Sequence, residues 1–264
     1  MTALPLSAAR LPLRSALTDA GTLVGRCIRL TRRDADSLVM AIVLPLVLMA
    51  LFVYVFGGAI ATGTDYVDYV VPGIVLLCSG YGAASTAMAV AADMASGMTD
   101  RLRSLPIAGW SVLAGHVVAS VVRNALSTAV VVAAAVGMGF RPDATAVEWA
   151  ATAGLLLLYV LALSWLAAGL GALASSIEAA SGLSFVMLFI PYLSSAFVPT
   201  GTMPAALRAV AEHQPVTPVI ETVRGLLTGT PVGSSGWQAA TWCTGLLAAT
   251  SCFAAWAYRR RTAR

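Results

Sequence analysis

The sequence predicts an all-α integral membrane protein with six transmembrane helices, an N-terminal amphipathic interfacial helix and two short external helices between spans five and six. First, 59% of the 264 residues are apolar and only 11% are charged, which leaves too few polar side chains to cover a water-soluble globule. Second, several charge-free runs reach the roughly 20 residues that a helix needs to cross a bilayer. Third, these runs are apolar on every face, whereas the strands of a membrane barrel alternate. We expect one transmembrane domain over residues 1–264.

Charge and cysteine patterns argue against other classes. All sixteen basic residues are Arg, and they stand at the ends of apolar runs, where they favour a role in topology over nucleic-acid binding. Three of the four Cys lie inside apolar runs and none has a metal-binding spacing, so buried thiols and no metal site are predicted. The first apolar run is too long for a signal peptide, and we expect the N-terminus to be retained.

Residues 12–36 precede the first span and form an amphipathic helix on a helical wheel. One half of the wheel is apolar, with Leu17 and Leu23, and the other half is mainly basic, with Arg26 and Arg29. We expect this helix to lie in the plane of the membrane surface, because its basic face suits anionic headgroups. A solvated helix packed on a partner protein is the alternative.

Five charge-free runs and one run that contains a single Arg define the six spans. They cover residues 38–57, 71–92, 112–138, 149–174, 181–198 and 237–258. The second span opens at Val71-Pro72-Gly73, where proline suits the first turn of a helix. Small residues at four-residue spacing in spans two and four favour close packing of these helices within one chain.

Span three contains three polar side chains, His116, Arg123 and Asn124. An Arg at membrane depth costs roughly 2.5–3.5 kcal/mol unless it is paired or reaches the interface. Either the membrane part of this span begins near Asn124 and leaves Arg123 at the interface, or Arg123 makes an internal contact. Asp93 and Glu178 are the candidate partners for such a contact.

Two connecting segments are too polar to rest in hydrocarbon. Residues 93–110 hold two acids, two Arg and helix-breaking Gly and Pro. Residues 199–236 hold five Pro and two short helices that begin at Pro. Before this second segment, span five ends in a polar cluster that either lines a substrate path or satisfies backbone groups freed by a proline: Tyr192, Ser194 and Ser195.

The Arg distribution orients the spans. Six spans place both termini on one side. The N-terminal tail, residues 93–110 and the C-terminus together hold twelve of the sixteen Arg, against three in the loops of the other side. Because cytoplasmic loops carry the excess of basic residues, both termini and residues 93–110 are predicted to be cytoplasmic and residues 199–236 external. The predicted location is a bacterial plasma membrane, with lipid as the surroundings.

Three stretches resemble the type-2 ABC exporter permeases, notably the daunorubicin-resistance permease group. They are GMTDRLRSLPI at 97–107, QPVTPVIETVRGLL at 214–227 and YVVPGIV at 69–75; Gln214 departs from the Asn common in that group. The resemblance implies that residues 97–107 form a cytoplasmic coupling helix that docks on a cytosolic ATPase. It also implies two ATPase copies, which carry ATP and Mg, and a second permease that is identical or a sibling. The carried-over coupling contacts are Asp100, Arg101 and Arg103.

The predicted function is the permease subunit of an ATP-driven exporter of a hydrophobic drug, antibiotic or lipid-like molecule. The sequence has no nucleotide-binding, paired-His or nucleophile-elbow motif, so no catalytic residue or cofactor is predicted on this chain. A secondary transporter or channel is the alternative, but it needs ionisable residues within spans. A membrane-embedded enzyme would have only His116 and Arg123 available. In the external segment, Glu221 and Arg224 stand at i and i+3 and are expected to form a structural salt bridge.

Overall fold

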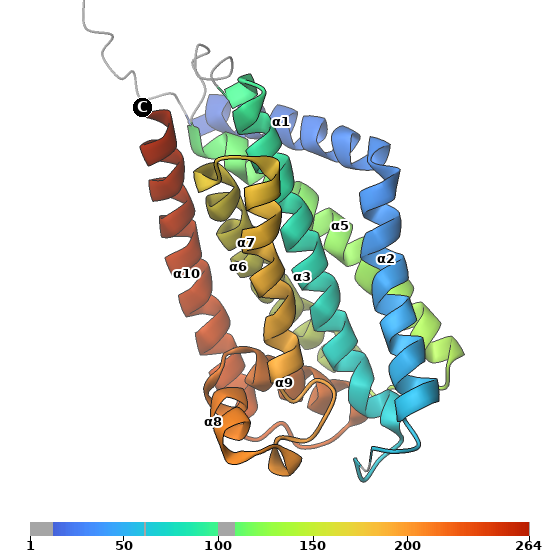
Figure 1. Ribbon diagram of the computed structural model, residues 1–264. Coiled ribbons are helices and arrows are strands. Elements are labelled where there is room, and N and C mark those ends of the chain that lie inside the picture. The colour runs from blue at the N-terminus through green and yellow to red at the C-terminus, as the bar shows by residue number, and fades with distance from the viewer. Residues whose placement is uncertain (1–12, 61, 100–108, 264) are drawn as a thin grey trace, which may run out of the picture.

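The computed structural model describes residues 13–60, 62–99 and 109–263, and these form a bundle of long helices (Figure 1). The all-helical architecture predicted from the sequence is confirmed for these residues. In chain order the elements are α1 (Leu13–Arg33), α2 (Ala35–Ala50), η1 (Leu51–Phe56), α3 (Tyr66–Ala95), α5 (Gly109–Gly137), α6 (Ala146–Leu173), α7 (Ile177–Phe189), η2 (Ile190–Leu193), η3 (Thr200–Thr202), α8 (Ala205–His213), α9 (Val216–Thr228) and α10 (Ser235–Thr262).

Four helices within the described ranges are long and apolar enough to cross a bilayer. They are Ser37–Phe56, Tyr66–Ala95, Ser111–Gly137 and Ala146–Leu173. Residues Ile177–Leu193 form a shorter apolar helix. α10 is 28 residues long, but it carries several Thr, a Gln and three Trp, so it is less apolar than the other four. The number of six crossings therefore stays a prediction.

The two ends of the bundle differ in construction. At one end, α1 lies across the long helices, and the C-terminal turns of α10 lie at the same end (Figure 1). At the other end, the short helices α8 and α9 cap the bundle (Figure 1). The amphipathic helix and the Arg-rich end of α10 thus share one end, and the Pro-rich residues 199–236 gather at the opposite one.

Small side chains let α3 and α6 cross at close range. Gly171 of α6 faces the backbone of α3, where a Cβ at this position would lie 2.3 Å from the Ala87 carbonyl oxygen. Ala87 is fully buried in a cluster of small residues from both helices. The predicted packing of these two faces within one chain is confirmed, because close contact between backbones needs side chains no larger than a methyl group at the crossing.

α3 begins earlier than the predicted second span. Its first residue is Tyr66, which follows Asp65 as the N-cap, so Pro72 lies inside the helix and not at its start. The apolar run misplaced this boundary because Asp68 interrupts it. An acidic side chain in the first turn nevertheless suits a helix, since it lies near the positive end of the helix dipole.

α7 ends before the predicted fifth span does. The α-helix stops at Phe189, a 3₁₀ turn covers Ile190–Leu193, and residues 194–198 are not helical. The prediction of a helical span to residue 198 is therefore wrong in its last part. Pro191 explains the difference, because proline has no N–H for the helical ladder and its ring obstructs the preceding turn.

Candidate functional sites

A charged cluster joins three helices at the end of the bundle where α1 lies. Arg26 of α1 donates two hydrogen bonds to Asp93 of α3, from Nη1 to Oδ2 at 2.8 Å and from Nη2 to Oδ1 at 2.9 Å. His116 of α5 donates from Nε2 to the same Oδ2 at 2.9 Å. The hydrogen bond to Asp93 raises the pKa of Arg26, against the opposing effect of partial burial. We call these three residues the inner cluster; it ties α1, α3 and α5 together.

The inner cluster holds helices in place and is poorly arranged for catalysis. The Cys27 thiol lies beside the His116 imidazole, so a thiol, an imidazole and a carboxylate are neighbours. Cys27 is only 4% exposed and His116 only 6%. Both carboxylate oxygens of Asp93 also accept from Arg26. Because a catalytic nucleophile must meet its substrate, this buried set serves to position the helices.

Two residues of the inner cluster flank the predicted coupling helix in the sequence. Asp93 lies near the end of α3, and His116 lies near the start of α5. Between them, Met98 packs against Leu23 of α1 and Val112 of α5. The predicted coupling contacts lie outside the described residues, so their role stays a prediction: Asp100, Arg101 and Arg103.

Arg123 contacts α1, and neither expected partner binds it. Its Nη2 donates to Thr31 Oγ1 at 3.1 Å, and Asp34 attracts it electrostatically. The prediction of Asp93 as its partner is wrong, because that carboxylate belongs to the inner cluster. The prediction of Glu178 is also wrong, because that side chain accepts from Ser176 at the start of α7. Since α1 lies across the end of the bundle, the guanidinium reaches the layer where the interface is expected.

Arg224 of α9 fastens the opposite end of the bundle through backbone carbonyls. Its Nε donates to the Tyr69 oxygen at 3.1 Å, and its Nη2 donates to the Ser195 oxygen at 2.8 Å. The guanidinium carbon lies 3.8 Å from the centroid of the Tyr69 ring. The Tyr69 hydroxyl also donates to the Ser195 oxygen, at 2.9 Å. Burial lowers the pKa of Arg224, while Tyr69 and Glu221 oppose this shift. We call Arg224, Tyr69 and residues 194–198 the outer cap.

The expected salt bridge between Glu221 and Arg224 is wrong for the described residues. Neither of the ion pairs found there includes these two side chains. Glu221 instead accepts from Ser235 Oγ at 3.2 Å. The reason is that residues 194–198 lack helical hydrogen bonds, and their buried carbonyls need donors. A guanidinium with several N–H groups supplies them.

Two of the stretches that carry the family resemblance meet in the outer cap. Residues 69–75 supply Tyr69 and Gly73, and residues 214–227 supply Arg224. Gly73 lies so close to the non-helical segment that a Cβ there would approach the Ala196 Cβ to 2.6 Å. Gln214 donates from Nε2 to the Leu193 oxygen at 2.6 Å. The side-chain amide therefore still forms a hydrogen bond to the backbone here, although Gln is longer than the Asn common in the family.

The three predicted substrate-path residues have different roles. Ser194 is buried, donates to the Pro191 oxygen and accepts from the Ala196 N–H at 3.2 Å, so it satisfies backbone groups near the proline. Ser195 contributes its carbonyl to the outer cap. Tyr192 is half-buried and contacts Tyr81, which lines a cavity of about 330 Å³ between α2, α3 and α7. None of the three predicted residues lines the larger groove described next.

A groove of about 520 Å³ lies between α3, α5, α6 and α9. Seventeen side chains line it, and none of them is charged. Ala129 of α5 and Ala153 of α6 line the groove and are exposed, so it opens on the surface of the bundle. Val223 and Leu227 of α9 also line it, beside the outer cap. Its size and apolar lining are typical of small-molecule sites.

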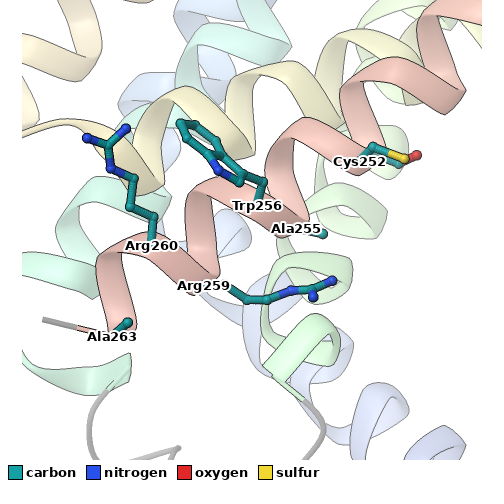
Figure 2. A pocket seen from close by; sticks show the side chains of 7 residues that line it. Cys252, Ala255, Trp256, Arg259, Arg260 and Ala263 are labelled. Atoms are coloured by element: carbon teal, nitrogen blue, oxygen red, sulfur yellow. The ribbon is translucent and has the colours of Figure 1, made fainter.

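The last turns of α10 carry a basic and aromatic surface at the same end as α1. Figure 2 shows the pocket beside these turns and the side chains of Trp256 and Arg260. The guanidinium carbon of Arg260 lies 5.3 Å from the centroid of the Trp256 ring. Cys252 is exposed here, whereas the other three Cys are buried as predicted. Trp and Arg at the end of a membrane helix lie at the level of the headgroups. If α10 is the sixth span, as the sequence predicts, this surface is expected at its membrane boundary.

Comparison with known proteins defines the class. Residues 18–228 match the model of the ABC-2 type transporter family. The chain belongs to this family and is a permease, the membrane-spanning part of an ABC transporter. The daunorubicin resistance ABC transporter permease protein DrrB1 of Streptomyces coeruleorubidus is 29% identical over 228 residues, which cover 85% of this chain and 81% of that protein. The probable doxorubicin resistance ABC transporter permease protein DrrC of Mycobacterium tuberculosis is 26% identical over 256 residues, which cover 96% and 91%. The resemblance to type-2 ABC permeases is confirmed.

Sequence reasoning missed the inner cluster and the groove. The helical wheel predicts that Arg26 faces the lipid headgroups, and the sequence makes Asp93 a candidate partner of Arg123. One available signal was that Asp93 and His116 flank the aqueous connector, one on each side. The groove gave no such signal, because its lining comes from four helices whose relative rotation no local pattern determines.

Proposed function

We propose that this permease, together with a cytosolic ATPase, exports an apolar molecule out of the cell. Membership of the ABC-2 type transporter family supports the ATPase partner, and the names of both relatives, daunorubicin and doxorubicin resistance permeases, support export of a hydrophobic drug or antibiotic. The assembly would contain two permeases, identical or siblings, and two ATPases that hold ATP and Mg. The inner cluster, whose Asp93 and His116 flank residues 97–107 in the sequence, is the observation that carries the proposal.

In this proposal, residues 97–107 dock on the ATPase, and the inner cluster passes their motion to the helices. The connector can move independently of the membrane helices only if its flanks are free. Here Asp93 binds both α1 and α5, so a displacement of the connector shifts all three helices together. Such a rigid link suits conversion of ATPase closure into motion of the spans, because packed elements shift as bodies between discrete arrangements.

The proposed orientation puts α1, the connector and the C-terminus in the cytoplasm. Cysteines introduced at Gly201 and Thr262, in a variant without the native thiols, report it. A membrane-impermeant thiol reagent added to whole cells should label the Gly201→Cys variant and leave Thr262→Cys unlabelled until the cells are opened. The reverse labelling would place the connector outside and rule out docking on a cytosolic ATPase.

Arg101→Glu tests the coupling role directly. The variant should insert normally but lose co-purification with the cytosolic ATPase and lose efflux, because the charge reversal acts on the docking surface. Arg261→Glu, at the same end of the bundle but on α10, is the matched control and should retain both. If Arg101→Glu retains the ATPase and full efflux, residues 97–107 are not the coupling element.

A further inference from the structure

Two neighbouring cavities flank the last turns of α10. One is the pocket of Figure 2, and the other, of about 460 Å³, lies between α10, α6 and the start of α5. We call the second one, between Leu113, Trp165 and Arg259, the lateral cavity. Ser251, Ala255 and Arg259 line both cavities, and because they are four residues apart they follow one face of the helix.

The lateral cavity runs along α10 from the interior of the bundle to its end. Ser251 and Arg259 are eight residues apart, which is about 12 Å along a helix. Leu113 stands near the start of the apolar helix Ser111–Gly137, which is long enough to cross a bilayer, and it belongs to the same buried cluster as Tyr258. Arg259 follows Tyr258 directly, so its guanidinium is expected at the level of the headgroups, while Ser251 lies deeper in the membrane.

The guanidinium of Arg259 has no counter-charge. The side chain is exposed, and neither ion pair in the part of the chain that the structure describes includes it. No described acidic side chain lines either cavity, and the sequence has no Asp or Glu after Glu221. The hydroxyls of Ser251 and Thr262 donate to carbonyl oxygens of α10 itself. Arg259 therefore determines the charge of a ligand in the lateral cavity, and that ligand must be an anion.

The rest of the lining requires that the anion also has an apolar part. Leu113, Trp165 and Ala255 form the side of the cavity that lies away from Arg259. A guanidinium pairs with phosphate through two parallel hydrogen bonds, and an acyl chain suits the apolar lining. This end of the bundle is predicted to be cytoplasmic, and basic pockets between membrane helices on that side bind anionic headgroups.

We propose that the lateral cavity binds an anionic phospholipid of the bilayer, with its phosphate on Arg259 and one acyl chain along Ala255 and Trp165. Charge disfavours two other occupants. The N-terminal residues 1–12 include Arg10 and no acid, and an uncharged cargo molecule would leave the guanidinium unpaired. The inference concerns the bilayer around the permease, and it depends neither on the cargo nor on the ATPase.

Quenching of tryptophan fluorescence by brominated lipid measures the binding. The purified full-length permease is placed in phosphatidylcholine bilayers that contain a growing fraction of phosphatidylglycerol with brominated acyl chains, or of brominated phosphatidylcholine as the reference. Trp165 lines the cavity, and the difference from Trp165→Phe isolates its signal. We expect a binding constant about fivefold higher for phosphatidylglycerol, because one Arg near an anionic surface contributes about this factor. A ratio near one would overturn the proposal.

Arg259→Gln tests the charged contact, with Arg261→Gln as its matched control. Both side chains are exposed and each substitution removes one positive charge, but of the two Arg259 alone lines the cavities. Arg259→Gln should lower the ratio to about one, and Arg261→Gln should leave it unchanged. Both variants should melt with the wild type, because exposed substitutions have small effects on stability. An equal decrease in both variants would indicate a general effect of surface charge and would overturn the site.

Ala255→Leu tests the position of the acyl chain, with Ala248→Leu as its control. Both alanines belong to α10, but Ala255 lines the lateral cavity and Ala248 does not. A leucine at position 255 fills part of the apolar lining, so it should abolish the preference of Trp165 for brominated phosphatidylglycerol. Ala248→Leu should retain this preference. If Ala255→Leu also retains it, the lipid does not bind in this cavity.

Two further measurements separate the lipid from other ligands. Glycerol 3-phosphate, a soluble headgroup without acyl chains, should not displace the brominated lipid, and displacement would identify a phosphate site in place of a lipid site. Arg259→Gln should retain co-purification with the ATPase. Loss of the ATPase together with an unchanged lipid ratio would assign Arg259 to a protein surface and overturn the proposal. Failure of Arg101→Glu to uncouple the ATPase would remove the coupling role of residues 97–107 and leave the lipid site standing.

Discussion

The contact between Arg26 and Asp93 should contribute measurably to the stability of the permease. Arg26→Gln removes both charge-assisted hydrogen bonds while it keeps an uncharged polar side chain. The His116 hydrogen bond to Asp93 remains, so the carboxylate keeps one partner. Arg29→Gln is the matched control, because Arg29 lies one turn further along the same helix and is exposed.

The magnitude follows from the exposure of the two side chains. Breaking a fully buried ion pair by removing one partner destabilises a protein by about 3–5 kcal/mol, whereas an exposed pair contributes about 0–1 kcal/mol. Arg26 is 26% exposed and Asp93 is 14% exposed, which lies between these cases. We therefore expect a loss of about 2 kcal/mol, equivalent to a decrease of about 4–8 °C in melting temperature for a chain of this size.

Thermal unfolding of the purified proteins in one detergent gives the comparison. Arg26→Gln should melt well below the wild type, and Arg29→Gln should melt within a degree or two of it. In the Asp93→Asn background, Arg26→Gln should have a much smaller additional effect, because the two residues share one interaction. Equal melting temperatures for Arg26→Gln and Arg29→Gln would refute the stabilising role of the contact.

Two further substitutions test the remaining packing arguments. Gly171→Ala should lower the melting temperature, since a Cβ would meet the Ala87 carbonyl oxygen at 2.3 Å and overpacking costs about 1–3 kcal/mol. Gly154→Ala, where nothing lies within 4 Å, should not, and similar behaviour of the two would contradict the close crossing. Arg224→Gln should expose residues 199–236 to an externally added protease by releasing two carbonyls, whereas Ser195→Ala should leave cleavage unchanged because it keeps its carbonyl. Equal cleavage of Arg224→Gln and wild type would exclude Arg224 as the fastening residue.

The elements that the sequence predicted well are those set by local composition. Charge-free runs located the long helices, and prolines marked both short helices, although the second begins at Val216 and not at the predicted Pro218. Small-residue spacing predicted the close approach of α3 and α6. Each of these signals depends on neighbours along one helix, so it can be recognised in the sequence without knowledge of the fold.

The errors came from contacts between distant parts of the chain. From the sequence, Asp93 is one of two candidate partners of Arg123 because it lies near the end of a neighbouring span, but the rotation of α1 brings Arg26 to it instead. Glu221 and Arg224 were paired because i and i+3 residues are neighbours on a helix. The non-helical residues 194–198 compete for the guanidinium, and Pro191 is their one local sign in the sequence, because the apolar run is otherwise long enough for a helix.

The outer cap has a consequence for how this permease can diverge in sequence. Arg224 binds main-chain oxygens at positions 69 and 195, and every amino acid supplies such an oxygen. Substitutions at the two acceptor positions therefore leave the acceptors in place, while replacement of the donor removes both hydrogen bonds at once. Drift around position 195 can alter the surface that a departing molecule meets without loosening the end of the bundle, provided that Arg224 and Tyr69, whose hydroxyl donates to the same oxygen, are kept.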